Sequence, residues 1–136
     1  MSAMPAIWAA LDGHLANTAN LPDLVFENAP VFDPVQGSTY VSVEFLPTRT
    51  RPVVIGPDPQ KRYQGIYEMT VGVPRKRGPG QARDLAALLE ERFAAHTAIA
   101  GVDVFVSLEY TETKGSFDRG DFYCIPVQVG WYAFAQ

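Results

Sequence analysis

One segment of the sequence, Tyr63 to Ala95, changes its hydrophobic period part-way along, and this limits the folds that the chain can adopt. Apolar residues occupy every second position from Tyr67 to Val73, as in a strand with one buried face. Pro74 cannot donate a hydrogen bond to a sheet, so it is expected to end this strand. The apolar positions that follow have helical spacing; they are Ala82, Leu85, Ala86, Leu89 and Phe93. The segment therefore predicts a strand, a turn and a helix.

The residues before this segment predict a helix and two strands. Met4–Ala19 carries an apolar stripe and several alanines, which favour a helix. The short apolar run Leu24–Phe26 is compatible with an edge strand. The alternation from Val41 to Phe45 predicts a longer strand that Pro47 closes. Asn28–Ser38, which contains prolines and a glycine, is expected to be a loop.

The residues after the helix predict a second pair of strands. One runs from Asp103 to Tyr110, and the other follows Asp121. Thr113–Asp121 is expected to be a polar turn between them. The last strand is apolar on both faces, which a covered sheet or a subunit contact would explain. Pro126 lies within it and predicts an edge position or a bulge.

The predicted order of elements is therefore α-β-β-α-β-β, and the fold class is α+β. Two hairpins joined by a helical crossover give a mixed or antiparallel sheet with both helices on one face. We expect residues 1–136 to form a single domain, because a chain of 136 residues can bury one core.

Composition and charge exclude several classes of protein. The formal net charge of −4 and the isoelectric point of about 5.0 argue against a protein whose main task is to grip nucleic acid, since phosphate contact needs a cationic face. Cys124 is the single cysteine, so neither an intrachain disulfide nor a cysteine-rich zinc site can form. A reducing cytosol is the natural origin of such a chain. The sequence predicts no signal peptide and no membrane-spanning segment.

No motif predicts catalysis, a cofactor or a metal. His14 and His96 are expected on different helices, and neither has a second histidine at metal-binding spacing. Cys124 is expected mid-strand in apolar company, which fits a buried side chain better than a nucleophile. The turn from Gly72 to Gly80 matches neither the Walker nor the dinucleotide-binding fingerprint. We therefore expect no enzyme activity and no catalytic, cofactor-binding or metal-binding residues.

Two groups of residues are candidate contact sites. The only basic run, Arg75, Lys76 and Arg77, predicts a contact with acidic protein or with a phosphate backbone, or else a solvated loop. A ring of identical subunits would multiply these charges into a strong local field. Thr48–Arg62 is expected to be a long loop that serves as an arm for a neighbouring subunit. Its candidate contact residues are Arg49, Arg51, Val53, Ile55, Lys61 and Arg62.

Several segments, taken in order, resemble one protein family. They are Glu27–Phe32, Tyr40–Pro47, Tyr63–Tyr67 running through Val73 and Pro74 to Gly78-Pro79-Gly80, and the aromatic last strand. Together they span nearly the whole chain, and it resembles the tail terminator, or tail completion, proteins of lambda-like long-tailed bacteriophages and prophages. The resemblance implies a ring, a homohexamer, that caps the tail tube, stops its polymerisation and provides the surface for head–tail joining.

The resemblance also implies the partners of such a ring. They are other copies of the chain, the tail tube protein and the head–tail connector protein, with genomic DNA passing non-specifically through the lumen. No membrane, cofactor or catalysis is implied; assembly takes place in the bacterial host cytoplasm, and the product is part of the virion tail. Arg75, Lys76 and Arg77 become candidate residues of the lumen or of a ring face. Two alternatives remain: another head–tail neck component, or a small ligand-binding or enzymatic α+β domain, which a pocket with converging polar groups would favour.

Overall fold

The computed structural model describes residues 3–25, 39–52, 60–76 and 78–135 of the chain. The two helices are α1 (Met4–Ala16) and α2 (Gly80–Arg92). The strands are β1 (Asp23–Val25), β2 (Tyr40–Pro52), β3 (Lys61–Pro74), β4 (Ala98–Gly101), β5 (Val104–Thr113), β6 (Phe117–Arg119) and β7 (Phe122–Ala135). None of the described helices is long and apolar enough to cross a membrane.

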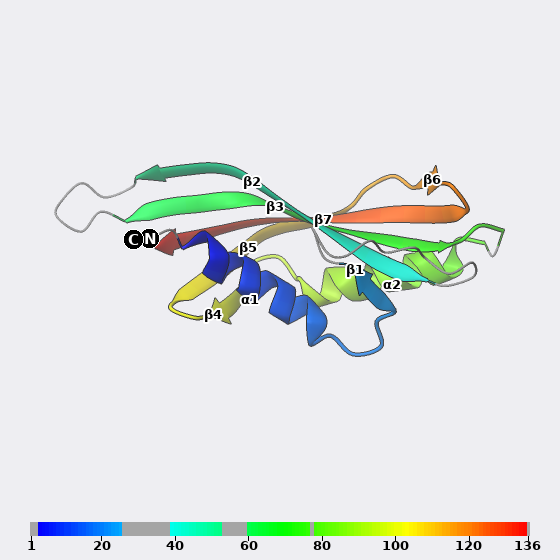
Figure 1. The fold of residues 1–136 in the computed structure, drawn as a ribbon, viewed down its shortest axis with the longest axis horizontal. Coiled ribbons are helices and arrows are strands. Elements are labelled where there is room, and N and C mark those ends of the chain that lie inside the picture. The colour runs from blue at the N-terminus through cyan, green and yellow to red at the C-terminus, as the bar shows by residue number, and fades with distance from the viewer. Residues whose placement is uncertain (1–2, 26–38, 53–59, 77, 136) are drawn as a thin grey trace.

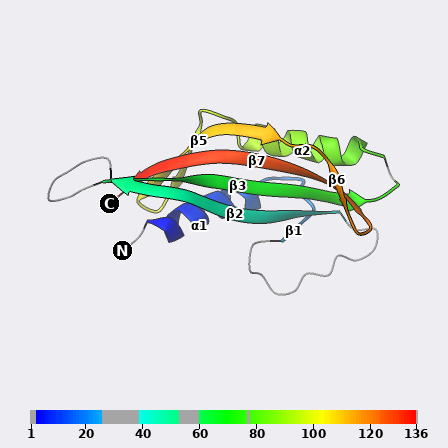
Figure 2. The same cartoon turned by 90° about the horizontal axis from the view of Figure 1, so that it is seen from above.

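The described strands form one mixed sheet in the order β1-β2-β3-β7-β5-β4, with β6 pairing one end of β7. β1 runs parallel to β2, and every other pair is antiparallel. Both helices lie on the same face of the sheet (Figure 1), and Figure 2 shows the strands from the opposite side. The predicted α+β class, the main order α-β-β-α-β-β and the placement of both helices on one face are confirmed.

The alternation of β3 and β7 turns their apolar residues toward the helices and so builds the core. Met69 and Val71 from β3 and Val129 and Trp131 from β7 are almost fully buried there. The helix residues packed on this layer are Ile7, Leu11 and Leu15 from α1, Ala82, Ala86 and Leu89 from α2, and Phe93 just after α2. Full burial of each large side chain contributes about 1.5–3 kcal/mol. Packing on the sheet, more than helix propensity, therefore holds both helices in place.

The opposite face of the sheet carries no described helix, and we call it the open face. Two tyrosines partly cover it, each lying over a glycine. A Cβ at Gly72 would lie 2.4 Å from the ring of Tyr40, and a Cβ at Gly130 would lie 2.1 Å from the ring of Tyr110. The two tyrosine rings fit on the open face because glycine, which has no Cβ, lies beneath each of them.

Pro47 does not end β2, contrary to the sequence-based expectation. β2 continues to Pro52 and pairs with β3 over its whole length. The register shifts between Pro47 and Arg49, so an irregularity in the ladder accommodates the proline, which has no N–H to donate. The prediction of a loop over Thr48–Arg62 is therefore wrong for its two ends, which belong to β2 and β3; residues 53–59 lie outside the described part of the chain.

Pro126 lies in a central strand, so the predicted edge position or bulge is wrong. Along one side, β7 pairs with β3. Along the other side, it pairs with β6 up to Cys124 and with β5 from Val127 onward. The Pro126 carbonyl accepts a hydrogen bond from the Lys114 N–H at 2.8 Å. In a strand, the N–H and the carbonyl of one residue point to the same side. The N–H that Pro126 lacks would therefore point to the place between the end of β5 and the start of β6.

Three other boundaries differ from the sequence-based expectation. α1 ends at Ala16 and not near Ala19, since the Thr18 N–H bonds to the Leu15 carbonyl and tightens the last turn. β4 was not expected, and only Ile99 of its residues is buried. The polar segment Thr113–Asp121 contains the short strand β6. The predicted edge strand is confirmed for Leu24 and Val25, which belong to β1 (Asp23–Val25) at the edge of the sheet. Phe26 and the loop predicted at 28–38 lie outside the described residues.

Candidate functional site

The basic run lies in the turn between β3 and α2. Arg75 and Lys76 are exposed, and Arg77 lies outside the described residues. The Arg75 N–H bonds to the Asp121 carbonyl at 2.9 Å, and its guanidinium lies 3.5 Å from the Gly120 carbonyl and 3.9 Å from an Asp118 carboxylate oxygen. The β6–β7 turn therefore holds the backbone at the start of the basic turn in place.

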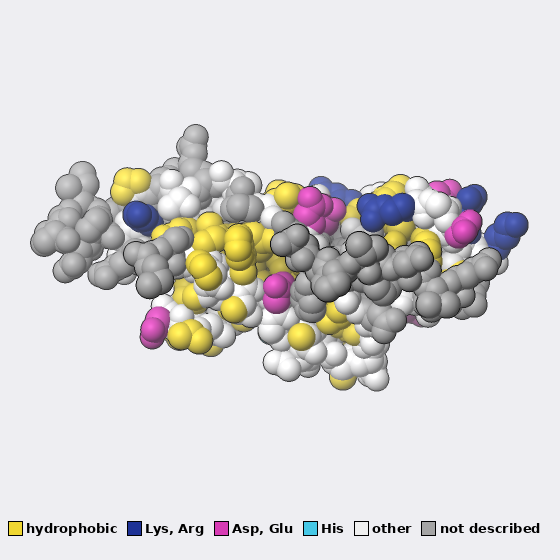
Figure 3. Space-filling view, viewed as in Figure 1, with side chains coloured by type: hydrophobic (Ala, Val, Ile, Leu, Met, Phe, Trp, Pro, Cys, Tyr) yellow, Lys and Arg dark blue, Asp and Glu magenta, His cyan; other side chains and the backbone are white. Residues whose placement is uncertain are grey.

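A depression of about 380 Å³ lies beside this turn, and we call it the basic depression. Its lining residues are Pro74, Arg75, Lys76, Gly78, Pro79, Arg83, Asp118 and Tyr123. Lys76 and Gly78 have φ values of 71° and 77°, the left-handed conformation that folds the turn back toward α2. Lys and Arg side chains gather at this end of the molecule (right-hand end of Figure 3). The site combines an apolar floor with three described cations and one carboxylate.

The four described residues of the predicted arm, Arg49, Arg51, Lys61 and Arg62, lie in the paired ends of β2 and β3. Arg49 and Arg51 are opposite Gln64 and Arg62 in the β2–β3 ladder, and their own side chains are outside the description. Lys61 is exposed at the start of β3. Val53 and Ile55 lie outside the described residues. The four described residues therefore belong to strands and not to a loop, and their role as a subunit contact stays a prediction.

Arg62 has a defined environment on the open face. Its guanidinium lies 4.7 Å from the centre of the Tyr132 ring, a cation–π contact, and 4.0 Å from a Glu109 carboxylate oxygen. The Tyr132 ring meets Phe134 edge-on at 5.9 Å. Phe134 is 47% exposed, so this end of the open face presents aromatic surface to solvent.

A row of acidic and amide side chains crosses the middle of the open face. The ladder places Glu44 of β2 opposite Glu68 of β3, Glu68 opposite Gln128 of β7, and Gln128 opposite Glu112 of β5. Gln128 Nε2 donates to Glu68 at 2.7 Å, and Lys114 Nζ lies 2.7 Å from Glu112. Beside the row, Leu46 and Ile66 form a cross-strand apolar pair. The sequence showed Glu44 and Glu68 only as polar positions of alternating strands; the strand register, which it did not give, creates the row.

Cys124, His14 and Tyr67 each have a bonding partner elsewhere in the chain. The Cys124 thiol is buried 3.9 Å from the Tyr40 hydroxyl, and burial raises the pKa of both groups. His14 Nε2 lies 2.7 Å from the Arg92 carbonyl, and its ring packs edge-on against Phe93. Tyr67 donates to Asp12 at 2.6 Å, and burial together with this bond raises the pKa of Tyr67 far above its usual range. No group of three or more potential metal ligands occurs among the described residues.

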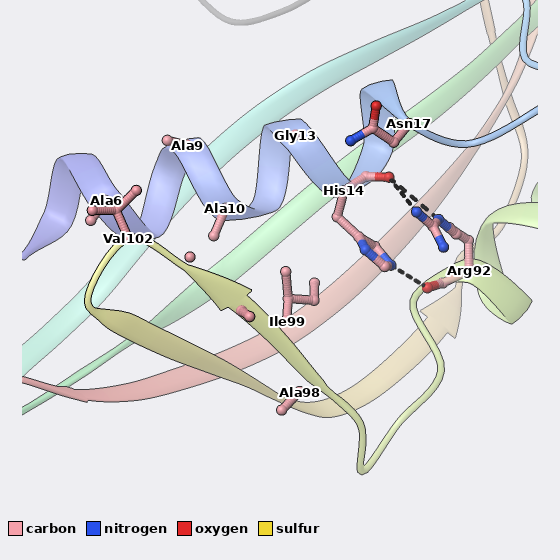
Figure 4. Close-up of a pocket in the computed structure, with 12 residues that line it drawn as sticks. Ala6, Ala9, Ala10, Gly13, His14, Asn17, Arg92, Ala98, Ile99 and Val102 are labelled. Atoms are coloured by element: carbon pink, nitrogen blue, oxygen red, sulfur yellow. Dashed lines mark hydrogen bonds between the residues drawn. The ribbon is translucent and has the colours of Figure 1, made fainter.

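A second depression, of about 470 Å³, lies between α1 and β4 (Figure 4). Small side chains line most of it, including Ala6, Ala10, Ala98 and Ala100. At one end His14 and Arg92 hydrogen-bond to each other's backbone. The His14 and Arg92 side chains are engaged in these bonds, and Asn17 is the other polar side chain that lines the depression.

These features define a small α+β protein whose described strands form one sheet with both helices on one face (Figure 1). A family model of phage tail terminator proteins matches residues 6–131. The chain therefore belongs to the phage tail terminator family, which makes it a structural protein of the phage tail.

Comparison with solved structures supports the fold. One solved chain, named only by a sequence identifier, is 22% identical and superposes with a TM-score of 0.73. The match covers 100% of this chain and 97% of the other. A likeness at this identity establishes the shared fold alone. The comparison with curated protein sequences found no match.

Proposed function

We propose that this chain is the tail terminator of a long-tailed phage: a homohexameric ring that caps the finished tail tube and stops its polymerisation. The other side of the ring offers the surface to which the head–tail connector binds, and genomic DNA passes through the lumen. The ring acts by contact, without catalysis or a cofactor. Family membership over residues 6–131 is the observation that carries this proposal.

The surfaces of the subunit support an assembling role. Phe105 and Phe134 on the open face are 71% and 47% exposed, and Trp8 on α1 is 44% exposed. Figure 3 shows apolar side chains gathered over α1 and the adjoining part of the sheet. Exposed apolar surface of this kind marks contacts with other proteins. A subunit that must meet neighbours, tube and connector needs several such surfaces.

Growth of tail tubes in the presence of the chain tests the proposal. Purified tube protein would be polymerised with and without it, and tube lengths and tube ends measured by electron microscopy. We expect shorter tubes with a ring at one end, and capped tails that join to filled heads. An unrelated protein of similar size and charge is the control. Unchanged tube lengths together with bare tube ends would overturn the proposal.

A further inference from the structure

We propose that the open face of one copy binds the basic depression of a second copy, with Glu44 and Glu68 facing Lys76 and Arg83. The inference rests on the proposed function, since it supplies the contact between neighbouring subunits. Two different surfaces of the same chain meet in it, so each copy offers one surface to the copy before it and the other to the copy after it.

The open face offers an apolar pair flanked by two carboxylates. Leu46, which is 38% exposed, is opposite Ile66, and two residues further along the same strands Glu44 is opposite Glu68. The ion pairs of the described residues join Arg62 to Glu109, Arg75 to Asp118 and Lys114 to Glu112. Within that part of the chain, therefore, no cation neutralises Glu44 or Glu68. Like charges directly opposite on neighbouring strands repel, so a cationic partner would relieve this repulsion.

The basic depression offers the complementary arrangement. Pro74, Pro79 and Tyr123 give it an apolar floor. Lys76 and Arg83 stand at its rim, both exposed, and none of the ion pairs of the described residues involves them. An apolar side chain flanked by carboxylates fits an apolar floor flanked by cations. The Leu46–Ile66 pair would fill the depression while the four charges pair around it.

The two surfaces cannot meet within one copy. Glu68 and Pro74, which lines the basic depression, lie six residues apart on the same strand β3, which corresponds to about 20 Å of extended chain. A contact between unlike surfaces of identical subunits is heterologous, and it closes into a ring when the rotation between neighbours divides a full turn. Charge complementarity also gives a chain with net charge −4 a local attraction between copies that otherwise repel.

A charge exchange between two variants tests the contact. E44R gives a chain with cations on both surfaces, and R83E gives a chain with carboxylates on both. Each variant alone should lose self-association by about tenfold or more, measured by sedimentation with and without tube protein. An equimolar mixture should recover it, because each surface then meets its opposite. The recovered association should weaken as salt rises from about 50 to 500 mM.

A pair of engineered cysteines tests the proximity directly. A chain carrying L46C, mixed with a chain carrying P79C under oxidised glutathione, should give a disulfide-linked pair of chains. V102C is the matched control for L46C, because Val102 is 79% exposed but lies in the β4–β5 turn and lines neither the Glu44–Glu68 row nor the basic depression. Mixed with P79C it should give no more crosslink than the background.

The possible results separate this contact from the proposed function. If E44R and R83E associate as the wild type does, or their mixture shows no recovery, the contact is overturned while tube capping stands. If R83E alone loses only DNA retention, and E44R has no effect, the basic depression is a DNA surface and the contact is again overturned. If the wild type neither self-associates nor caps tubes, both proposals fall.

Discussion

His14 and Arg92 cap each other's helices. His14 Nε2 donates to the Arg92 carbonyl at 2.7 Å, while Arg92 Nε and Nη2 both lie 3.3 Å from the His14 carbonyl (Figure 4). Each residue sits in the last turn of its helix, where carbonyls lack helical partners. A carbonyl can only accept, so Nε2 of His14 must carry the hydrogen. The pair joins the ends of α1 and α2, which are 78 residues apart in sequence.

The free energy of unfolding should decrease as the pH is lowered, because His14 then takes up a proton. Burial lowers the pKa of His14 below its ordinary value of 6.5, with the Arg92 guanidinium adding to the effect, while the bond to the Arg92 carbonyl opposes it. The unfolded chain therefore binds the proton more tightly, so the free energy of unfolding is highest above pH 6.5 and falls as pH drops below that value. H14Q should remove this part of the slope in urea unfolding measured between about pH 5 and 7.5. The exposed His96 provides the control, and H96Q should keep the slope.

Tyr67 should stabilise the attachment of α1 to the sheet through its hydroxyl. It is fully buried and donates to Asp12 of α1 at 2.6 Å. Y67F keeps the ring and its stack on Phe93 but removes this donor from the carboxylate. We expect a loss of about 1.5–3 kcal/mol in the free energy of unfolding, as for hydrogen bonds to charged groups. Y123F, at a partly buried tyrosine on the same face, is the comparison; an equal loss in both variants would show that the Asp12 bond adds nothing.

The main elements could be predicted because their hydrophobic periods are regular. β3 and α2 each keep one period over many residues, and Pro79 at the start of α2 agrees with it. The prolines within strands could not be placed, because their tolerance depends on the neighbouring strands. Pro47 sits at a register shift, and Pro126 sits where β7 changes partners. Neither condition is visible in the local sequence.

The candidate surfaces were predictable only in part. Arg75 and Lys76 form a compact run, so the sequence alone drew attention to the basic turn. Glu44 and Glu68 are 24 positions apart, and only the β2–β3 register makes them neighbours. Arg83 lies on α2 and enters the basic depression because the turn folds back at Lys76. The surface is thus a product of register and turn geometry, which hydrophobic patterning does not specify.

The glycine beneath Tyr110 should be difficult to replace. A Cβ at position 130 would lie 2.1 Å from the ring, so G130A must push the ring outward and open its packing. Overpacking of this kind costs about 1–3 kcal/mol. The cost of G130A in free energy of unfolding should be smaller in a Y110A background. Urea unfolding of the wild type, G130A, Y110A and the double variant would show this. G115A is the control, since nothing lies within 4 Å of a Cβ there. Equal costs of G130A with and without the tyrosine would contradict this account of the open face.

Replacement of the three cations of the basic turn by serine should weaken assembly and leave the fold intact. The triple change R75S, K76S and R77S acts on a turn whose backbone is held by the Arg75 N–H bond to Asp121, and serine retains that N–H. We expect nearly unchanged thermal unfolding but weaker self-association and weaker tube capping. The difference from wild type should be large at low salt and narrow at high salt, because screening removes the same attraction in the wild type.

R119S serves as the control, because Arg119 is an exposed cation at the same end of the molecule that does not line the basic depression. A general effect of net charge would make R119S reproduce about a third of the loss at low salt. A specific contact would leave R119S close to wild type and concentrate the loss in the triple variant. Phage particles that mature normally with the triple variant would instead show that Arg75, Lys76 and Arg77 are solvated loop residues without a partner.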